Sequence, residues 1–144
     1  NKTRRVAERF DWVHGVDRLQ IAQRLNAQRP AHAAPLNVCI QVRVADEPTK
    51  GGIEPADLPA LASEVAALER LRLRGLMCLP PESEDHELQR SWFRRLRELM
   101  EALNTQGLSL DTLSMGMSGD FETAIEEGAT HVRIGTALFG ERSR

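Results

Sequence analysis

Hydrophobic and polar positions along this 144-residue chain follow two alternating periods, one typical of strands and one typical of helices. Short runs with period-two alternation predict strands, and apolar residues spaced three or four apart predict helices. Strands are predicted at 10–16, 36–45, 71–79, 110–116 and 131–138. Helices are predicted between them at 17–29, 55–69, 84–104 and 120–127. This βα alternation favours a parallel sheet with right-handed helical crossovers.

The longest predicted helix, 84–104, carries a continuous apolar stripe. Residues at helical spacing share one face, and that face packs on a core. The stripe consists of Leu88, Trp92, Leu96, Leu99 and Leu103. We therefore expect all of these side chains to face the sheet.

The segment 36–45 has two chemically different faces, because alternate residues of a strand point to opposite sides. The apolar set is Val38, Ile40, Val42 and Val44, and the polar set is Asn37, Cys39, Gln41 and Arg43. Strands of a sheet covered by helices on both faces are usually apolar throughout. The polar face therefore has two interpretations. It lines a barrel interior that holds a polar ligand, or it is the wet face of an edge strand.

Two segments near the end of the sequence place small residues directly after predicted strands. Segment 114–120 reads Ser-Met-Gly-Met-Ser-Gly-Asp, and 132–140 reads Val-Arg-Ile-Gly-Thr-Ala-Leu-Phe-Gly. Small residues let backbone N–H groups approach an anion, and the first loop leads into a predicted helix whose positive dipole end faces the same point. In (β/α)8 barrels, phosphate often binds at the loops after strands seven and eight. The pattern indicates phosphate binding, with simple turn formation as the alternative.

Length and composition predict one domain over 1–144, since 41% of the residues are hydrophobic. Lys and Arg number 19 and are interleaved with 21 Asp and Glu, so we expect no nucleic-acid partner. The sequence has no apolar run of transmembrane length and no signal peptide, so we expect no membrane partner. The four histidines show no metal-ligand spacing, and we expect no metal site. The distant Cys39 and Cys78 predict reduced thiols and a cytoplasmic location.

Several sequence blocks together resemble the pyridoxal-phosphate homeostasis proteins, the YggS-like or proline synthase co-transcribed family. The resemblance extends over essentially the whole chain. The blocks are Asn1-Lys2, Phe-Asp-Trp (10–12) with His14 and Asp17-Arg18, Leu-Asn-Val (36–38) with Gln41, Glu47 with Lys-Gly-Gly-Ile (50–53), Leu-Arg-Gly-Leu-Met (73–77), Leu-Ser-Met-Gly-Met-Ser (113–118) with Asp120, and Val-Arg-Ile-Gly-Thr (132–136) with Phe139-Gly140. The last two blocks are highly specific in combination.

This resemblance implies an alanine-racemase-like (β/α)8 TIM barrel that holds pyridoxal 5'-phosphate (PLP) at the carboxyl ends of its strands. The chain would supply the C-terminal five strands, as one partial PLP-binding domain. The implied function is non-catalytic PLP binding in vitamin B6 and amino-acid homeostasis. By resemblance, Arg133 lies beside the pyridine nitrogen, and the phosphate site consists of Ser118, Gly135 and Thr136 with the loop neighbours Met117 and Ile134.

The family's Schiff-base lysine lies on the first barrel strand, and no such strand is present in this sequence. Lysine occurs only at Lys2 and Lys50. By resemblance, Lys2 belongs to the third-strand motif and Lys50 to the loop after the fifth strand. Neither matches the Schiff-base position, so we expect phosphate and ring contacts only and no catalytic residue.

Three other functions remain as alternatives. An amino-acid racemase of this fold needs a second, β-rich domain and a tyrosine base, and the sequence contains no tyrosine. A sugar-phosphate enzyme needs acid and base residues. Asp120 is better interpreted as a helix cap, and Glu47 with Lys50 as an exposed pair. The third alternative is a partner-binding fragment without a ligand.

The association state depends on whether the barrel is complete. The chain begins without Met and without a strand, as though it enters a protein midway. The missing strands would leave open edges at 10–16 and 131–138, and open edges favour pairing with another chain. We expect self-association of the truncated barrel and a monomer for the full one.

Overall fold

The computed structural model describes residues 2–46 and 51–134, in which helices and parallel strands alternate. The strands are β1 (Trp12–Val16), β2 (Leu36–Gln41), β3 (Leu71–Met77), β4 (Thr112–Met117) and β5 (His131–Arg133). The helices are α1 (Lys2–Arg9), α2 (Leu19–Gln28), α3 (Leu58–Ala66), α4 (His86–Thr105) and α5 (Phe121–Glu126), with a short 3-10 turn at Pro55–Asp57. The predicted βα alternation is confirmed.

The strands form one sheet in the order β1-β2-β3-β4-β5, and every neighbouring pair is parallel. Because β2 lies between β1 and β3, the edge-strand interpretation of segment 36–45 is wrong. Val38, Ile40, Val42 and Val44 are all buried, as the alternation predicts. The edges of the described sheet are β1 and β5, as predicted. Strand β5 ends at Arg133, however, and residues 135–138 of the predicted strand 131–138 lie outside the described residues.

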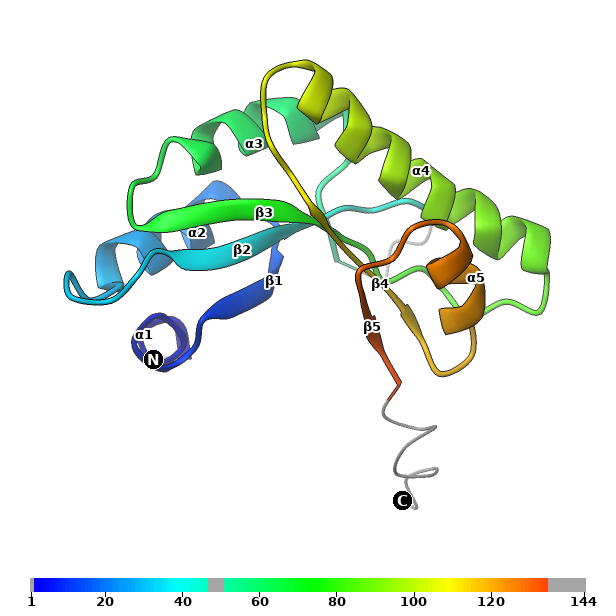
Figure 1. The fold of residues 1–144 in the computed structure, drawn as a ribbon, viewed down its shortest axis with the longest axis horizontal. Coiled ribbons are helices and arrows are strands. Elements are labelled where there is room, and N and C mark those ends of the chain that lie inside the picture. The colour runs from blue at the N-terminus through cyan, green and yellow to red at the C-terminus, as the bar shows by residue number, and fades with distance from the viewer. Residues whose placement is uncertain (1, 47–50, 135–144) are drawn as a thin grey trace.

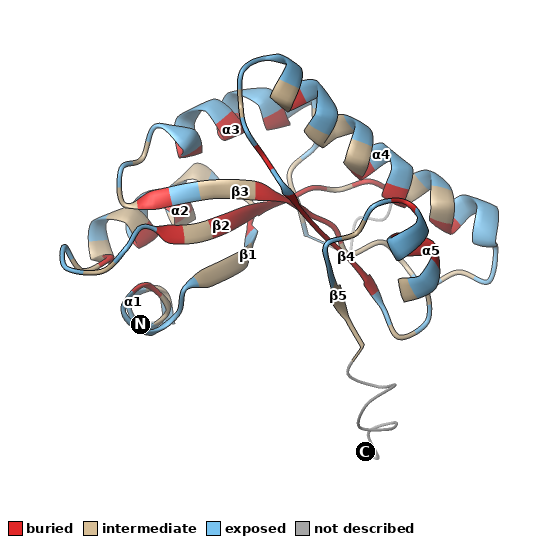
Figure 2. Cartoon of the chain, in the orientation of Figure 1, coloured by how far each residue is buried: buried red, intermediate tan, exposed pale blue. Residues whose placement is uncertain are grey.

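The sheet curves into an arch with helices α3 and α4 over its convex side and α1 beside β1 (Figure 1). Buried residues run along β2, β3 and β4 and along the helix faces turned toward them (Figure 2). The largest fully buried side chains include Phe93, Leu96, Leu76 and Ile40. The hydrophobic core therefore lies between the sheet and its outer helices, which leaves the concave side for polar residues.

Some sequence predictions differ from the structure in detail. Helix α1 was not predicted. Strand β2 ends at Gln41, and only a single parallel bridge, Val42 with Ile53, follows it. In α4, Leu88 is exposed, whereas Gln89 and Phe93 are buried, because the buried face near the start of this helix is turned by one residue from the predicted stripe.

Strands β3 and β4 approach unusually closely at Gly75. A Cβ atom at this position would lie 1.8 Å from the carbonyl oxygen of Thr112. No side chain fits at that distance without moving one strand. Gly75 therefore sets the close spacing of β3 and β4, and with it the position of the loop that follows β4. No helix in the described ranges is long and apolar enough to cross a membrane.

Candidate functional site

The loop after β4 is held by Asp120. Its carboxylate Oδ1 accepts a hydrogen bond from the backbone N–H of Met117 over 2.7 Å. Asp120 occupies the N-cap position of α5, but its side chain makes no capping bond to that helix. The predicted helix cap is therefore wrong in its detail, since the carboxylate closes the 117–120 turn instead. Met117 and Ser118 lie in this turn, and the Met117 side chain is exposed.

Gly116 makes the turn possible. Its φ is +105°, a conformation that side-chain-bearing residues rarely adopt. A Cβ atom there would also lie 2.7 Å from Cβ of Ala124 on α5. The glycine therefore lets α5 pack directly against the end of β4. Helix α5 has only 6 residues, so its dipole adds less to an anion site than the sequence pattern implies.

Arg133 ends β5 beside this loop, in register with Met117 of β4. Its Nη1 donates to the hydroxyl of Ser114 over 3.5 Å. Its Nη2 is buried and has no hydrogen-bond partner among the described atoms. Burial lowers the pKa of the guanidinium, while Cys78 and Asp120 act in the opposite direction. A half-buried arginine with an unused donor is suited to a ligand acceptor.

Side chains from both edge strands meet across the concave side. His14 Nδ1 on β1 lies 2.8 Å from Oγ of Ser114 on β4. The ring of His131, on β5, lies 5.4 Å from the Trp12 ring and 5.5 Å from the His14 ring. Burial, His131 and Arg133 lower the pKa of His14. The concave face is therefore polar and aromatic, which favours the interpretation of a barrel interior.

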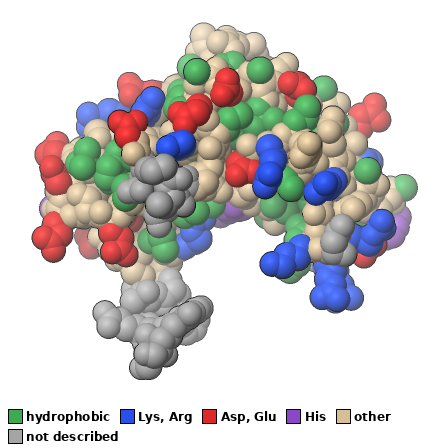
Figure 3. Space-filling view, turned by 180° about the vertical axis from the view of Figure 1, so that it is seen from behind, with side chains coloured by type: hydrophobic (Ala, Val, Ile, Leu, Met, Phe, Trp, Pro, Cys, Tyr) green, Lys and Arg blue, Asp and Glu red, His purple; other side chains and the backbone are tan. Residues whose placement is uncertain are grey.

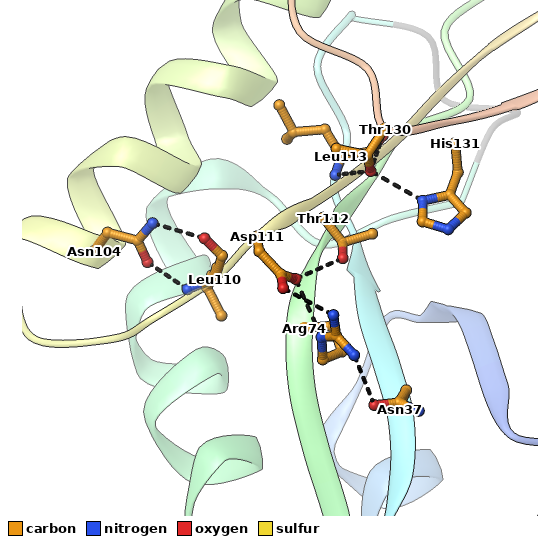
Figure 4. Close-up of polar contacts among 9 residues, drawn as sticks. All are labelled: Asn37, Arg74, Asn104, Leu110, Asp111, Thr112, Leu113, Thr130 and His131. Carbon is orange, nitrogen blue, oxygen red and sulfur yellow. Dashed lines mark hydrogen bonds and ion pairs between the residues drawn. The ribbon is translucent and has the colours of Figure 1, made fainter.

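A second network lies toward the amino ends of the strands (Figure 4). Arg74 donates to both carboxylate oxygens of Asp111, over 3.1 and 2.8 Å, and to Asn37. Its guanidinium also lies 4.7 Å from the centroid of the Trp12 ring. The pKa of Asp111 is lowered, first by its hydrogen bond with Arg74. Each guanidinium nitrogen of Arg74 already donates to Asp111 or Asn37. This network therefore stabilises the strands and is less suited to bind a ligand.

The molecular surface is hollowed where the concave face of the sheet lies (Figure 3). In Figure 3 the molecule is hollowed along its lower edge, beneath the sheet, and Lys and Arg side chains gather on the lobe that carries α1. No cluster of three or more His, Cys, Asp or Glu suited to a metal occurs within residues 2–46 and 51–134.

The structure brings four of the six expected site residues together at one end of the sheet: Met117, Ser118, Arg133 and Ile134. Gly135 and Thr136 lie outside the described residues, as do Glu47 and Lys50. Sequence analysis assigned no role to His14 or Ser114, although both lie in the quoted motifs. The sequence signal that could have found Ser114 is its position. It precedes Gly116 by two residues, so both lie on the same face of β4.

Comparison with known proteins defines the class of protein. The family profile described as alanine racemase, N-terminal domain, matches residues 1–143. Alanine racemase from Corynebacterium glutamicum shares 18% identity, with a TM-score of 0.67, over 90% of this chain and 36% of the racemase, and at that identity it shows the fold alone. The chain belongs to the alanine racemase N-terminal domain family.

Individual relatives are similar to this chain at higher identity. The pyridoxal phosphate homeostasis proteins of Pseudomonas aeruginosa and Escherichia coli are 62% and 53% identical over 99% of this chain. PipY of Synechococcus elongatus, solved with PLP bound, has a TM-score of 0.88 and 37% identity, over 97% of this chain and 66% of PipY. The chain spans about 60% of the length of the curated relatives that it matches.

Proposed function

We propose that this chain is the PLP-binding part of a non-catalytic protein of vitamin B6 and amino-acid homeostasis, and that residues 1–144 form one partial barrel domain. The observation that carries the proposal is Arg133. Its buried Nη2 has no hydrogen-bond partner among residues 2–46 and 51–134, and an unsatisfied buried donor of a charged group is costly. The nitrogen of a pyridine ring is an acceptor that would satisfy it.

The neighbouring loop supplies groups for the phosphate. Ser118 lies in the 117–120 turn, next to Met117, which is in register with Arg133. We assign Ser118, Gly135 and Thr136 to the phosphate, with Met117 and Ile134 as loop neighbours. Hydroxyl and backbone N–H groups bind a phosphate dianion through charge-assisted hydrogen bonds.

The choice of arginine also bears on catalysis. PLP supplies an electron-accepting pyridine ring when its ring nitrogen is protonated. Arg133 holds its own proton, since guanidinium groups remain charged in proteins. It therefore donates to an unprotonated ring nitrogen, and this weakens the ring as an electron acceptor. This chemistry favours binding and carriage over carbanion catalysis.

We further propose that the strands are the last five of the barrel. Strand β1 carries no lysine, and the chain has only Lys2, on α1, and Lys50. A chain that contained the first strand of such a barrel would carry the Schiff-base lysine there. Reduction with borohydride in the presence of PLP should therefore label no unique lysine of this chain, and stoichiometric labelling of Lys2 or Lys50 would contradict the assignment.

The alternatives have less support. A racemase needs a tyrosine base, and the chain has no tyrosine. A binding fragment without ligand leaves the buried donor of Arg133 unexplained. Cys39 and Cys78 are buried free thiols, which agrees with a reducing compartment, so the cytoplasm is the proposed location.

PLP titration of the protein at full length tests the proposal, with Arg133→Gln as the variant and Arg24→Gln as its control. Arg24 lies exposed on α2, away from the concave face. Loss of a charge-assisted hydrogen bond should weaken PLP binding about tenfold or more in Arg133→Gln. Arg24→Gln should bind as the parent does. Equal affinity of both variants, or no PLP binding by the parent protein, would overturn the proposal.

A further inference from the structure

Three side chains from three different strands form a continuous polar chain across the concave face. His14 on β1 contacts Ser114 on β4 at 2.8 Å, and Arg133 on β5 donates to the same hydroxyl over 3.5 Å. Strands β1 and β4 are separated by two strands in the sheet. The contact therefore depends on the curvature of the arch and not on strand pairing.

Donor and acceptor chemistry gives this chain a direction. Arginine only donates, and a serine hydroxyl accepts up to two hydrogen bonds while donating one. Since Arg133 occupies one acceptor position of Ser114, the Ser114 proton is available to His14 Nδ1 when the imidazole is neutral. Ser114 is 1% exposed, so water does not compete for these positions.

The groups around His14 favour its neutral form. Among the described residues, the charges that act on it are those of His131 and Arg133, both on β5, and burial acts in the same direction. The contacts on β1 and β4, with Trp12 and Ser114, carry no charge. The positive charge of Arg133 therefore disfavours a second positive charge on the His14 imidazole.

We propose that His14 and Ser114 are positioning residues that hold the Arg133 guanidinium so that its unpartnered Nη2 faces the ring nitrogen of the cofactor. The inference rests on the proposed function, because it assigns the ring contact to Arg133. Protonated His14 would donate to the Ser114 oxygen, so the Ser114 hydroxyl hydrogen would have to turn away from His14. It would also add a positive charge beside Arg133. The arrangement that aims Nη2 is thus lost when His14 is protonated.

The test uses the protein at full length, with PLP, pyridoxal and inorganic phosphate as separate probes. The variants are Ser114→Ala and His14→Asn, since an asparagine amide can replace Nδ1 as a partner of Ser114. The control is His32→Asn, at an exposed histidine outside the cluster. Thermal unfolding of each ligand-free variant shows whether it is folded.

Ser114→Ala should weaken PLP and pyridoxal binding about fivefold to tenfold, leave phosphate binding unchanged, and shift the absorption band of bound PLP. His14→Asn keeps a partner for Ser114, so at neutral pH it should weaken PLP binding less than Ser114→Ala does. The parent should lose affinity relative to His14→Asn as pH falls through the lowered His14 pKa, and His32→Asn should follow the parent.

The outcomes separate this inference from the proposed function. If the parent binds PLP but Ser114→Ala leaves affinity and absorption band unchanged, the positioning role is wrong and the proposed function stands. Parallel pH profiles of the parent and His14→Asn would likewise overturn it. If the parent binds no PLP, the proposed function itself fails.

Discussion

Arg90 on α4 donates through Nη1 to the carboxylate of Glu127, directly after α5, over 2.9 Å. Glu127 is 7% exposed and also contacts Arg94 and Arg97 of the same helix. A single carboxylate therefore ties α5 to α4. Since α5 packs on Gly116 of β4, this contact also fixes the loop that carries Ser118.

Replacing this carboxylate should destabilise the fold. Glu127→Gln removes the charge that pairs with three arginines, and we expect a loss of about 1–2 kcal/mol in the free energy of unfolding, because the arginines remain partly solvated. Urea unfolding measures it. The control, Glu126→Gln, removes a more exposed partner of Arg90 and should cost less than about 0.5 kcal/mol. Equal costs would contradict the anchoring role.

The contribution of Glu127 should depend on pH with a defined sign. Hydrogen bonds with its arginines lower the pKa of Glu127 against the opposing effect of burial. A carboxylate with a lowered folded-state pKa stabilises the fold above its unfolded-state pKa of about 4.3. The difference between the parent protein and Glu127→Gln should be full at neutral pH and disappear as pH falls through the folded-state pKa. A difference that grows in acid would contradict this.

The two glycines of the 116–120 loop should respond differently to alanine. Gly116→Ala forces a side chain into positive φ and against Ala124, and should destabilise the protein by about 2 kcal/mol or more. Gly119→Ala places its Cβ in open space and should change stability by less than about 0.5 kcal/mol. Thermal unfolding of the ligand-free proteins compares them. Similar melting temperatures for both variants would show that the close approach is relieved elsewhere.

The assigned phosphate contacts predict a ligand-specific effect. Ser118→Ala combined with Thr136→Val should weaken PLP binding about tenfold or more but leave pyridoxal, which has no phosphate, nearly unaffected. The matched control is Ser91→Ala with Thr105→Val, whose hydroxyls bond to carbonyls within α4. Titration monitored by absorbance provides both affinities. A parallel loss for PLP and pyridoxal would place these residues elsewhere in the site.

The open edges of the sheet predict association. Expressed alone, this 144-residue chain exposes β1 and β5 at the two ends of its described sheet. Unpaired backbone groups at a sheet edge favour pairing with another chain. Sedimentation velocity should show dimers or larger species. A monodisperse monomer at high concentration would show that the chain protects its own edges.

Local sequence patterns were sufficient for much of the fold. The positions of β2, α3 and β3 follow from short-range periodicity, because burial of one face is encoded in the spacing of neighbouring residues. The small and hydroxyl residues of segments 114–120 and 132–136 can be read from the sequence in the same way. In each case the information lies within a few residues of the element that it specifies.

Helix α1 shows where local information ends. Its eight residues are mostly charged, and so short a helix is marginal by itself. Arg29 follows α2 directly, and it donates to the carbonyl oxygens of Ala7 and Phe10, at the carboxyl end of α1. The partner that stabilises α1 is thus about twenty residues away in sequence, where no periodicity of the first segment can indicate it.

The same reason applies to the site. The sequence determined the five strands and the four helices between them, their parallel order and the loops that offer small and hydroxyl residues. Only the tertiary structure decided that Trp12 and His14 meet His131, that Ser114 links His14 to Arg133, and that Asp120 closes a turn without capping α5. The contacts of His131 with Trp12 and His14, and that of His14 with Ser114, join strands that are not neighbours. They therefore depend on how far the whole sheet curves, which is set by the packing of all of its faces together.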